Sequence, residues 1–213
     1  MIKYILFDLD DTLYPTSAGL MTEISQRMSE YMVARIGISP AEVDRVRHDY
    51  WARYGTTLRG LYLERHIDAQ AFLDYVHDID LAKYLQTDAR LDAALAALPQ
   101  PKSIFTNASA KHAHNVLRAL GVSPHFNEIF DINYIGYESK PAPSAYDKVA
   151  QALPVPAHEC LMIDDTARNL VPAKALGMQT VWLDGNDNPR AAEGSDAADF
   201  VIKSIYDVVG VVK

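Results

Sequence analysis

The sequence of 213 residues contains a single cysteine, Cys160, and therefore no disulfide can form within the chain. Cys160 lies in an apolar segment, so we expect a buried and unreactive thiol. Lysine and arginine number 20 against 28 aspartates and glutamates, and they form no cluster. The resulting net charge of −8 argues against partners that are nucleic-acid polymers or anionic membrane surfaces.

The sequence also lacks a long hydrophobic run. The apolar segment that follows Met1 is too short for a signal peptide, and no stretch reaches the length of a membrane span. We therefore predict a cytoplasmic protein without a membrane partner. Hydrophobic residues nevertheless make up 49% of the chain, which is enough for one substantial core or for a domain that carries an insertion.

Residues 15–81 have a helical pattern that no strand pattern interrupts. In the first helix, apolar residues recur at helical spacing, namely Ile24, Met28, Tyr31, Met32 and Ile36. The segment Ser39-Pro40-Ala41-Glu42 combines a capping box with proline at the first helical position, and it predicts that a second helix begins here. That helix ends at Gly55, and a further short helix follows Asp68.

Short apolar strands and helices alternate from about residue 82 onward. The predicted strands are residues 4–7, 103–105, 129–132, 160–163, 180–183 and 200–202, and the helices include 91–98, 110–120, 144–153 and 167–176. This alternation predicts an α/β fold, a doubly wound and mostly parallel sheet with helices on both faces. Residues 1–14 and 82–213 then form the core, residues 15–81 an inserted helical cap domain, and residues 184–196 a polar loop.

Polar side chains follow three of the predicted strands directly. They are Asp8 and Asp10, Thr106 and Asn107, and Asp164 and Asp165. Ligands of such sheets bind beyond the carboxyl ends of the strands, so we expect these residues to face one site. Carboxylates gathered at one sheet edge repel one another and need a cation, most simply Mg²⁺, which prefers oxygen ligands. The pattern predicts a magnesium site formed by Asp8, Asp10, Asp164 and Asp165, because helix capping would explain only one acid of each pair.

The residue types at this edge fit the transfer of a phosphoryl group. Asp8 is the predicted nucleophile, because a carboxylate can attack phosphorus and form an aspartyl-phosphate. Asp10 points to the same side of an extended chain and is the predicted general acid and base. Thr106 and Asn107 lie where a hydroxyl and backbone N–H groups can bind phosphate oxygens. Lys140 is predicted to supply a second cation beside the phosphate.

Taken in order, Asp8-x-Asp10-x-Thr12, Thr106, Lys140 and Asp164-Asp165 resemble the four motifs of the haloacid dehalogenase superfamily. The resemblance implies a Rossmann-like core, a helical cap inserted after the first strand, Mg²⁺, and the roles given above for Asp8, Asp10, Thr106 and Lys140. In the family pattern Asp165 aligns with the principal metal ligand. Asp164 stands where many members carry glycine and Asn169 where many carry a second acid, so we expect Asp164 to replace the missing carboxylate.

A closer resemblance, to the fungal and plant pyrimidine 5′-nucleotidase branch, comes from residues 7–14, 54–61 and 105–108. It implies that Tyr54 and Arg59 bind substrate from a flexible cap loop, as a stacking ring and a cation for a nucleoside 5′-monophosphate or another phosphomonoester. Plain packing of the cap helices, with Arg59 solvated or paired to Glu64, explains the segment equally well. His112 and His114 are interpreted as surface or packing residues.

The leading interpretation is a Mg²⁺-dependent phosphatase that acts on a small phosphorylated metabolite, as a monomer or a homodimer. A phosphomutase of sugar phosphates shares this chemistry as far as the phospho-enzyme. A 2-haloacid dehalogenase uses the same nucleophile but has no leaving alcohol to protonate, so Asp10 counts against it. A non-enzymatic phospho-receiver protein would carry its paired acids before the phosphorylated residue and would lack the cap.

Overall fold

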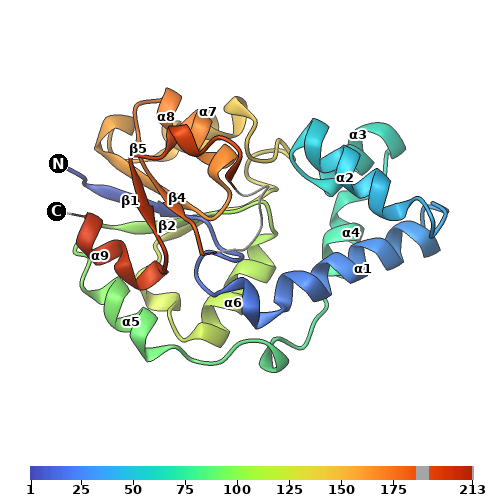
Figure 1. Ribbon diagram of the computed structural model, residues 1–213, viewed down its shortest axis with the longest axis horizontal. Helices are drawn as coiled ribbons and strands as arrows, with labels where there is room; N and C mark the ends of the chain where they lie inside the picture. The colour runs from blue at the N-terminus through green and yellow to red at the C-terminus, as the bar shows by residue number, and fades with distance from the viewer. Residues whose placement is uncertain (186–191, 213) are drawn as a thin grey trace.

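The computed structural model describes residues 1–185 and 192–212 of the chain. Its centre is a six-stranded sheet with the strand order β3-β2-β1-β4-β5-β6 (Figure 1). The strands are β1 Tyr4–Phe7, β2 Lys102–Phe105, β3 Glu128–Phe130, β4 Cys160–Asp164, β5 Gln179–Leu183 and β6 Phe200–Ile202. All neighbouring strands pair in parallel, which confirms the predicted α/β doubly wound fold.

Helices cover both faces of the sheet. Alternate side chains of β1 point to opposite faces, and every residue of β1 is buried. Tyr4 and Leu6 belong to one hydrophobic cluster, whereas Ile5 and Phe7 belong to the other. Helices α7 (Pro143–Ala152) and α8 (Leu170–Ala175) pack in the first cluster. The second cluster contains α5 (Ala89–Ala96), α6 (Ala110–Leu120) and α9 (Val208–Val211) on the other face (Figure 1).

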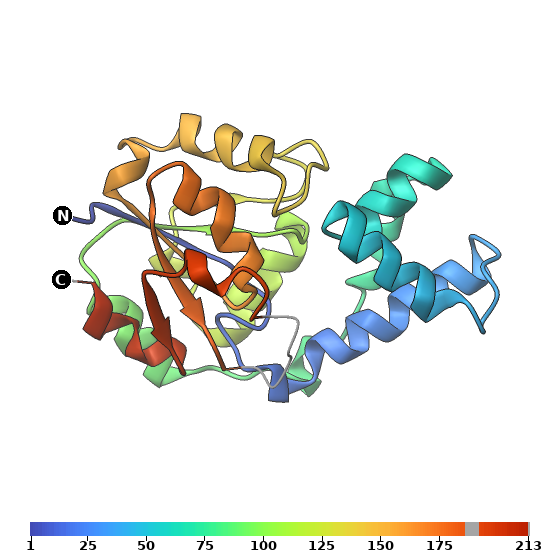
Figure 2. The same cartoon turned by 45° about the horizontal axis from the view of Figure 1, so that its top comes forward.

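Four helices stand beside the sheet, at the side where its strands end (Figures 1 and 2). We call them the cap helices: α1 Leu20–Ala34, α2 Val43–Tyr54, α3 Thr57–Arg65 and α4 Ala69–Val76. The assignment of residues 15–81 to a separate domain stays a prediction. No helix within the described residues is long and apolar enough to cross a bilayer.

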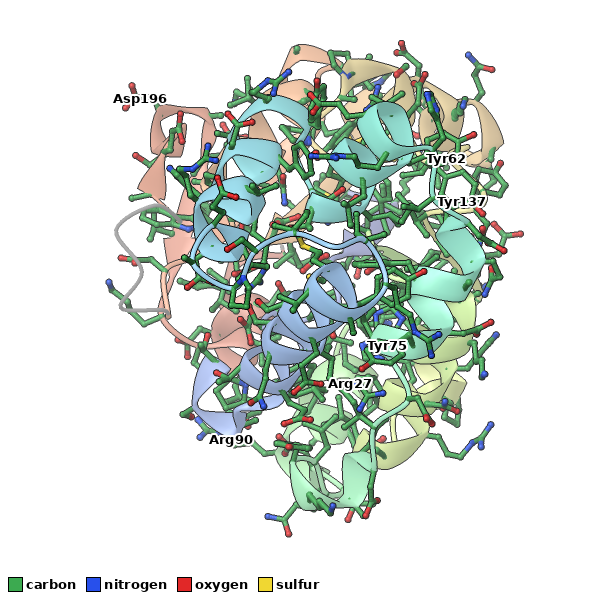
Figure 3. All side chains as sticks on the ribbon, turned by 90° about the vertical axis from the view of Figure 1, so that its right-hand side faces the viewer. Arg27, Tyr62, Tyr75, Arg90, Tyr137 and Asp196 are labelled. Carbon is green, nitrogen blue, oxygen red and sulfur yellow. The ribbon has the colours of Figure 1, made fainter. Side chains whose placement is uncertain are left out.

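Aromatic and arginine contacts bind the cap helices to one another and to the core. Arg27 of α1 donates to the carbonyl of Tyr75 in α4 at 2.7 Å and lies over its ring (Figure 3). Tyr62 of α3 stacks on Tyr137, from the segment after β3, with 5.2 Å between ring centroids (Figure 3). The cap helices are therefore packed on the core as well as linked to it by the chain.

Two predictions about the cap helices are wrong. Helix α2 begins at Val43 rather than at Ser39-Pro40. Residues 40–42 form a turn before it, in which the Ser39 carbonyl accepts from the N–H groups of Glu42 and Val43 and the Ser39 hydroxyl accepts from the Ala41 N–H at 3.3 Å. The Glu42 carboxylate pairs with Arg45, 3.1 Å away, so it is not the reciprocal cap that the sequence suggested.

The predicted loop around Arg59 is helix α3, in which Thr56 accepts the Arg59 N–H at 3.1 Å as a cap. Gly60 lies inside this helix because a β-carbon there would stand 2.2 Å from Cγ of Tyr50. Smaller differences concern residues 167–169, which form a 3₁₀ turn before α8, and α9, which the sequence pattern did not indicate. Within the predicted polar loop 184–196, residues 186–191 lie outside the described residues.

Candidate active site

The carboxyl ends of β1 and β4 bring Asp8, Lys140 and Asp164 together. Strands β1 and β4 are paired with Phe7 opposite Ile163, so the residues that follow lie at one sheet edge. Lys140 Nζ lies 2.7 Å from Asp8 Oδ1 and 2.7 Å from Asp164 Oδ2, and its side chain is 1% exposed. The second oxygen of Asp8 accepts a hydrogen bond from the Thr12 hydroxyl at 3.1 Å. Asp8 is thus oriented at both oxygens.

Asp8, Asp164 and Asp165 each offer a carboxylate oxygen, and these oxygens lie within 4.8 Å of one another. Burial raises the pKa of Asp8 to about 7, with a further increase from the charge of Asp164 and an opposing decrease from Lys140. Burial, and then the charge of Asp164, raise the pKa of Asp165 well above its ordinary value. Three acids therefore face one ammonium group, and this excess of buried negative charge together with all-oxygen donors fits a divalent cation such as Mg²⁺.

Asp164 is fully buried, and both of its oxygens are bound within the protein. Oδ1 accepts from the Thr166 N–H at 2.9 Å and from the Asn169 side chain at 2.9 Å, while Oδ2 faces Lys140. Asn169, which stands at the position of a second acid in the family pattern, therefore orients Asp164. The expectation that Asp164 replaces the missing carboxylate stays a prediction.

The structure places Asp10 on a separate set of partners. Asp10 Oδ1 accepts from the Tyr14 hydroxyl at 2.6 Å and lies 2.8 Å from His112 Nε2. Burial alone would raise the pKa of Asp10, but the charge and hydrogen bond of His112 lower it overall. Within the described residues, Asp10 is not part of the three-acid group, so its predicted role as a metal ligand stays a prediction.

His112 is a site residue that the sequence interpretation missed. It is 2% exposed, and its ring stacks on His77 with 4.1 Å between centroids. His77 in turn lies with Nδ1 3.3 Å from the Ser109 hydroxyl. His114, two residues further along the helix, is exposed and is therefore the surface residue of the two. The only available signal was position, because His112 belongs to the helix that follows Thr106.

Thr106 and Asn107 follow β2 at the same edge. Thr106 is buried, and its hydroxyl accepts the Ala108 N–H at 3.0 Å. The Asn107 amide binds the backbone of Lys140 twice, accepting its N–H at 2.8 Å and donating to its carbonyl at 3.2 Å. Asn107 therefore fixes the position of Lys140, in addition to the phosphate contact that the sequence predicts for it.

A cavity of about 320 Å³ joins this edge of the sheet to the cap helices. The core side of its lining includes Asp8, Asp10, Thr106, Asn107, Lys140 and Asp165. The cap side includes Ser25, Arg47, Trp51 and His77. A cavity of this size, with a few convergent polar groups, is typical of a small-molecule site.

Tyr54 and Arg59, the predicted substrate residues of the cap, are not among the residues that line the cavity. The Tyr54 hydroxyl donates to Glu64 at 2.6 Å, and Glu64 also pairs with Arg53 at 2.8 Å. Glu64 thus has Arg53 as its ionic partner in place of Arg59. Contact of Tyr54 and Arg59 with substrate stays a prediction.

The core and the cap helices meet tightly at Gly55. The guanidinium of Arg168, from the core, lies 3.4 Å above the Trp51 ring and donates to the carbonyls of Trp51 and Gly55, each at 3.1 Å. Gly55 has φ +88°, and a β-carbon there would stand 2.6 Å from the carbonyl oxygen of Lys140. Only glycine allows this approach.

Fold and site together are those of an enzyme with a parallel α/β sheet and a group of acids at the carboxyl edge of that sheet. The haloacid dehalogenase-like hydrolase family matches residues 2–177. The match covers more than half of the chain, so the chain belongs to this family.

Curated relatives in this family differ in name. Phosphate metabolism protein 8 of Saccharomyces cerevisiae is 28% identical over 196 residues, which cover 83% of this chain and 60% of that protein. A phosphoglycolate phosphatase of Neisseria gonorrhoeae is 25% identical, with 85% of this chain and 80% of that protein covered. A glyceraldehyde 3-phosphate phosphatase of Methanocaldococcus jannaschii is 25% identical, with 100% and 98% covered. The chain thus spans less than two thirds of the yeast protein.

Solved structures show the same fold. A HAD phosphatase from Thermococcus onnurineus superposes with a TM-score of 0.66 at 21% identity, over 99% of this chain and 97% of the other. The HAD-hydrolase YfnB from Bacillus subtilis, bound to magnesium, gives a TM-score of 0.65 at 18% identity, over 100% and 99%. At these identities the likeness shows the fold alone.

Proposed function

We propose that the protein is a Mg²⁺-dependent phosphatase that hydrolyses a small phosphomonoester through an aspartyl-phosphate. The observation that carries the proposal is the position of Asp8, held by Lys140 and Thr12 beside Asp164 and Asp165 at the floor of the cavity. The phosphatase names of two relatives support the same class of reaction.

The reaction consists of two displacements at phosphorus. An oxygen of Asp8 forms a bond to phosphorus while the ester P–O bond breaks, and the departing alcohol takes a proton through Asp10, whose carboxylate is hydrogen-bonded to His112 Nε2. Asp10 then takes a proton from water as the water attacks phosphorus, which releases phosphate and restores the Asp8 carboxylate. Lys140 balances negative charge beside the phosphate throughout.

The residues proposed to hold Mg²⁺ are Asp8, Asp164 and Asp165, with Asp10 as a further predicted ligand. When bound, the ion supplies positive charge that reduces repulsion between the carboxylates and the substrate phosphate. Lys140 alone offers one charge against three acids, which is why the proposal includes the metal.

The test is a screen for phosphate release from aryl phosphate, pyrimidine nucleoside 5′-monophosphates and small sugar phosphates, with and without Mg²⁺. We expect Asp8→Asn to lower release by about 10⁴-fold or more, because no nucleophile remains. Asp44→Asn, an exposed residue of α2, serves as the control and should leave release unchanged. Full activity of a folded Asp8→Asn variant would refute the mechanism, and isomerisation of sugar phosphates without phosphate release would favour the phosphomutase.

A pyrimidine nucleoside 5′-monophosphate is the second substrate that we consider, on the resemblance of residues 54–61 alone. If Arg59 selects nucleotides, Arg59→Ala should raise KM for them more than for aryl phosphate. Equal effects on both substrates would remove Arg59 from substrate selection. We further propose that the protein acts in the cytoplasm on a free metabolite, with no nucleic-acid or membrane partner, as a monomer or a homodimer.

A further inference from the structure

Arg47 stands on the cap side of the cavity, across from the acids of the core. It belongs to α2, and its guanidinium reaches α1, where Nη1 donates to the Ser29 hydroxyl at 3.0 Å and Nη2 donates to the Ser25 hydroxyl. Arg47 and Ser25 both line the cavity. The two serines hold the planar group in one orientation against the wall.

Within the described residues, Arg47 has no carboxylate partner. Its Nε is buried and makes no hydrogen bond. Burial lowers the pKa of Arg47, and the charge of Asp44 only partly opposes this. A partly buried guanidinium with no anion beside it is unfavourable, so the protein alone leaves this group incompletely satisfied. Its neighbours Arg45 and Arg53 on the same helix do pair with acids.

The other cations of the cavity already have a place in the proposed reaction or in the contact between core and cap. Lys140 pairs with Asp8 and Asp164, and in the proposed reaction it lies beside the phosphate. Arg168 donates to two carbonyls and covers the Trp51 ring, although its Nε, like that of Arg47, is buried without a hydrogen bond. Arg47 is thus a positive charge in the lining that neither the proposed reaction nor the contact between core and cap uses.

We infer that Arg47 binds a carboxylate on the alcohol part of the substrate, so that the preferred substrates are phosphate esters of small hydroxy acids. The inference rests on the proposed function. The flat guanidinium with a free Nε–H matches a carboxylate, which Arg binds through parallel hydrogen bonds. The Ser25 hydroxyl accepts a hydrogen bond from Arg47 and can donate its own proton to the carboxylate of the substrate. The cavity of about 320 Å³ suits a small acid.

The test compares phosphoglycolate with ethyl phosphate, which carries a methyl group in place of the carboxylate. We expect Arg47→Gln to lower kcat/KM for phosphoglycolate by about 10- to 100-fold and to change that for ethyl phosphate by less than about twofold, because only one substrate loses a charged hydrogen-bond pair. Arg47→Lys keeps the charge but loses the paired N–H donors of the guanidinium. Its kcat/KM for phosphoglycolate should lie between those of the unsubstituted protein and of Arg47→Gln. Equal losses on both substrates, or no loss on either, would overturn the inference.

Two control variants separate recognition from structure. Ser29→Ala removes one of the two hydroxyls that orient Arg47 but keeps the cation, so it should lower kcat/KM for phosphoglycolate less than Arg47→Gln does and leave that for ethyl phosphate unchanged. If Ser29→Ala and Arg47→Gln lower kcat/KM for both substrates alike, the role of Arg47 is packing and the inference fails. Arg45→Gln, on the exposed side of the same helix, should change neither substrate.

A binding measurement keeps this inference distinct from the proposed function. If the unsubstituted protein releases phosphate neither from these two compounds nor from those of the screen, the proposed function fails, and titration calorimetry of phosphoglycolate and ethyl phosphate then decides on Arg47. Tighter binding of phosphoglycolate than of ethyl phosphate, lost in Arg47→Gln, would support the carboxylate site. Equal binding, or no binding of phosphoglycolate, would overturn it.

Discussion

The two walls of the cavity differ in how their charged groups are paired. On the core wall, Asp8, Lys140 and Asp164 bind one another and their neighbours before any ligand arrives. On the cap wall, Arg47 keeps a buried N–H without a partner. The core wall is therefore prepared for one reaction, whereas the cap wall retains binding capacity for the part of the substrate that differs from one phosphomonoester to another.

The largest effect is expected from Lys140→Met, which removes the cation that the core wall places between Asp8 and Asp164. Removing the ammonium leaves Asp8 and Asp164 buried without their counterion, so we expect activity to disappear and the free energy of unfolding to fall by about 3–5 kcal/mol. Urea unfolding and phosphate release measure the two effects. Lys174→Met, which removes a half-exposed pair with Asp199, should cost about 1 kcal/mol or less. A similar loss in both variants would contradict the comparison.

The partner of Asp10 gives the next largest effect. We expect His112→Asn to lower kcat for ethyl phosphate by about 10- to 100-fold, because Asp10 loses the group that orients it. Para-nitrophenyl phosphate should be affected less, since its leaving group departs without a proton. The exposed His114→Asn on the same helix is the matched control. An equal fall for both substrates would mean that His112 supports the fold rather than proton transfer.

Metal binding should stabilise the core wall by an amount set by concentration, about 2.7 kcal/mol at 100 times Kd. We therefore expect MgCl₂ to raise the melting temperature and EDTA to reverse the rise. Asp165→Asn should abolish this response and yet stabilise the protein in EDTA, because burial raises the pKa of Asp165 and its charged form is unfavourable. Asp196→Asn, on the surface, is the control (Figure 3). A metal response that survives Asp165→Asn would place the ion elsewhere.

The smallest effect concerns His77 on the cap wall. Burial, and then the charge of His112, lower the pKa of His77 to about 3. The unfolded chain binds a proton there near pH 6.5 while the folded protein does not, so this contribution to stability is complete above that pH and is lost as pH falls toward 3. We expect His77→Asn to reduce the slope of unfolding free energy against pH between about pH 6.5 and 5. The reduction should reach about 1.4 kcal/mol per pH unit, which corresponds to one proton. Urea unfolding at several pH values measures the slope, and an unchanged slope would show that His77 titrates normally. His48→Asn is the exposed control.

Sequence predicted the core wall well because its signals are local. Apolar strands that end in Asp8, Thr106 and Asp164 need only parallel pairing to converge, and the alternation of strands and helices dictates that pairing. Helix 110–120 was predicted with its observed bounds, because Ser109 and Gly121 mark its two ends.

The cap wall was predicted poorly because its signals are tertiary. Gly60 disfavours a helix by propensity, and only the ring of Tyr50 explains its presence in α3. Arg47 lies one position after Val46 in an amphipathic pattern and looks like any solvated residue. Its isolation from acids appears only when α1 packs beside α2. Likewise, the contact of His112 with Asp10 joins residues that are 102 positions apart.

Gly55 has a consequence for relatives of this chain. No side chain fits between Gly55 and the Lys140 carbonyl. Substitution of Gly55 is therefore not tolerated as long as the cap helices and the core keep their present contact. A homologue with a larger residue at the aligned position must hold its cap helices farther from its core. The identity of that one residue therefore indicates the distance between cap helices and core in each member of the family.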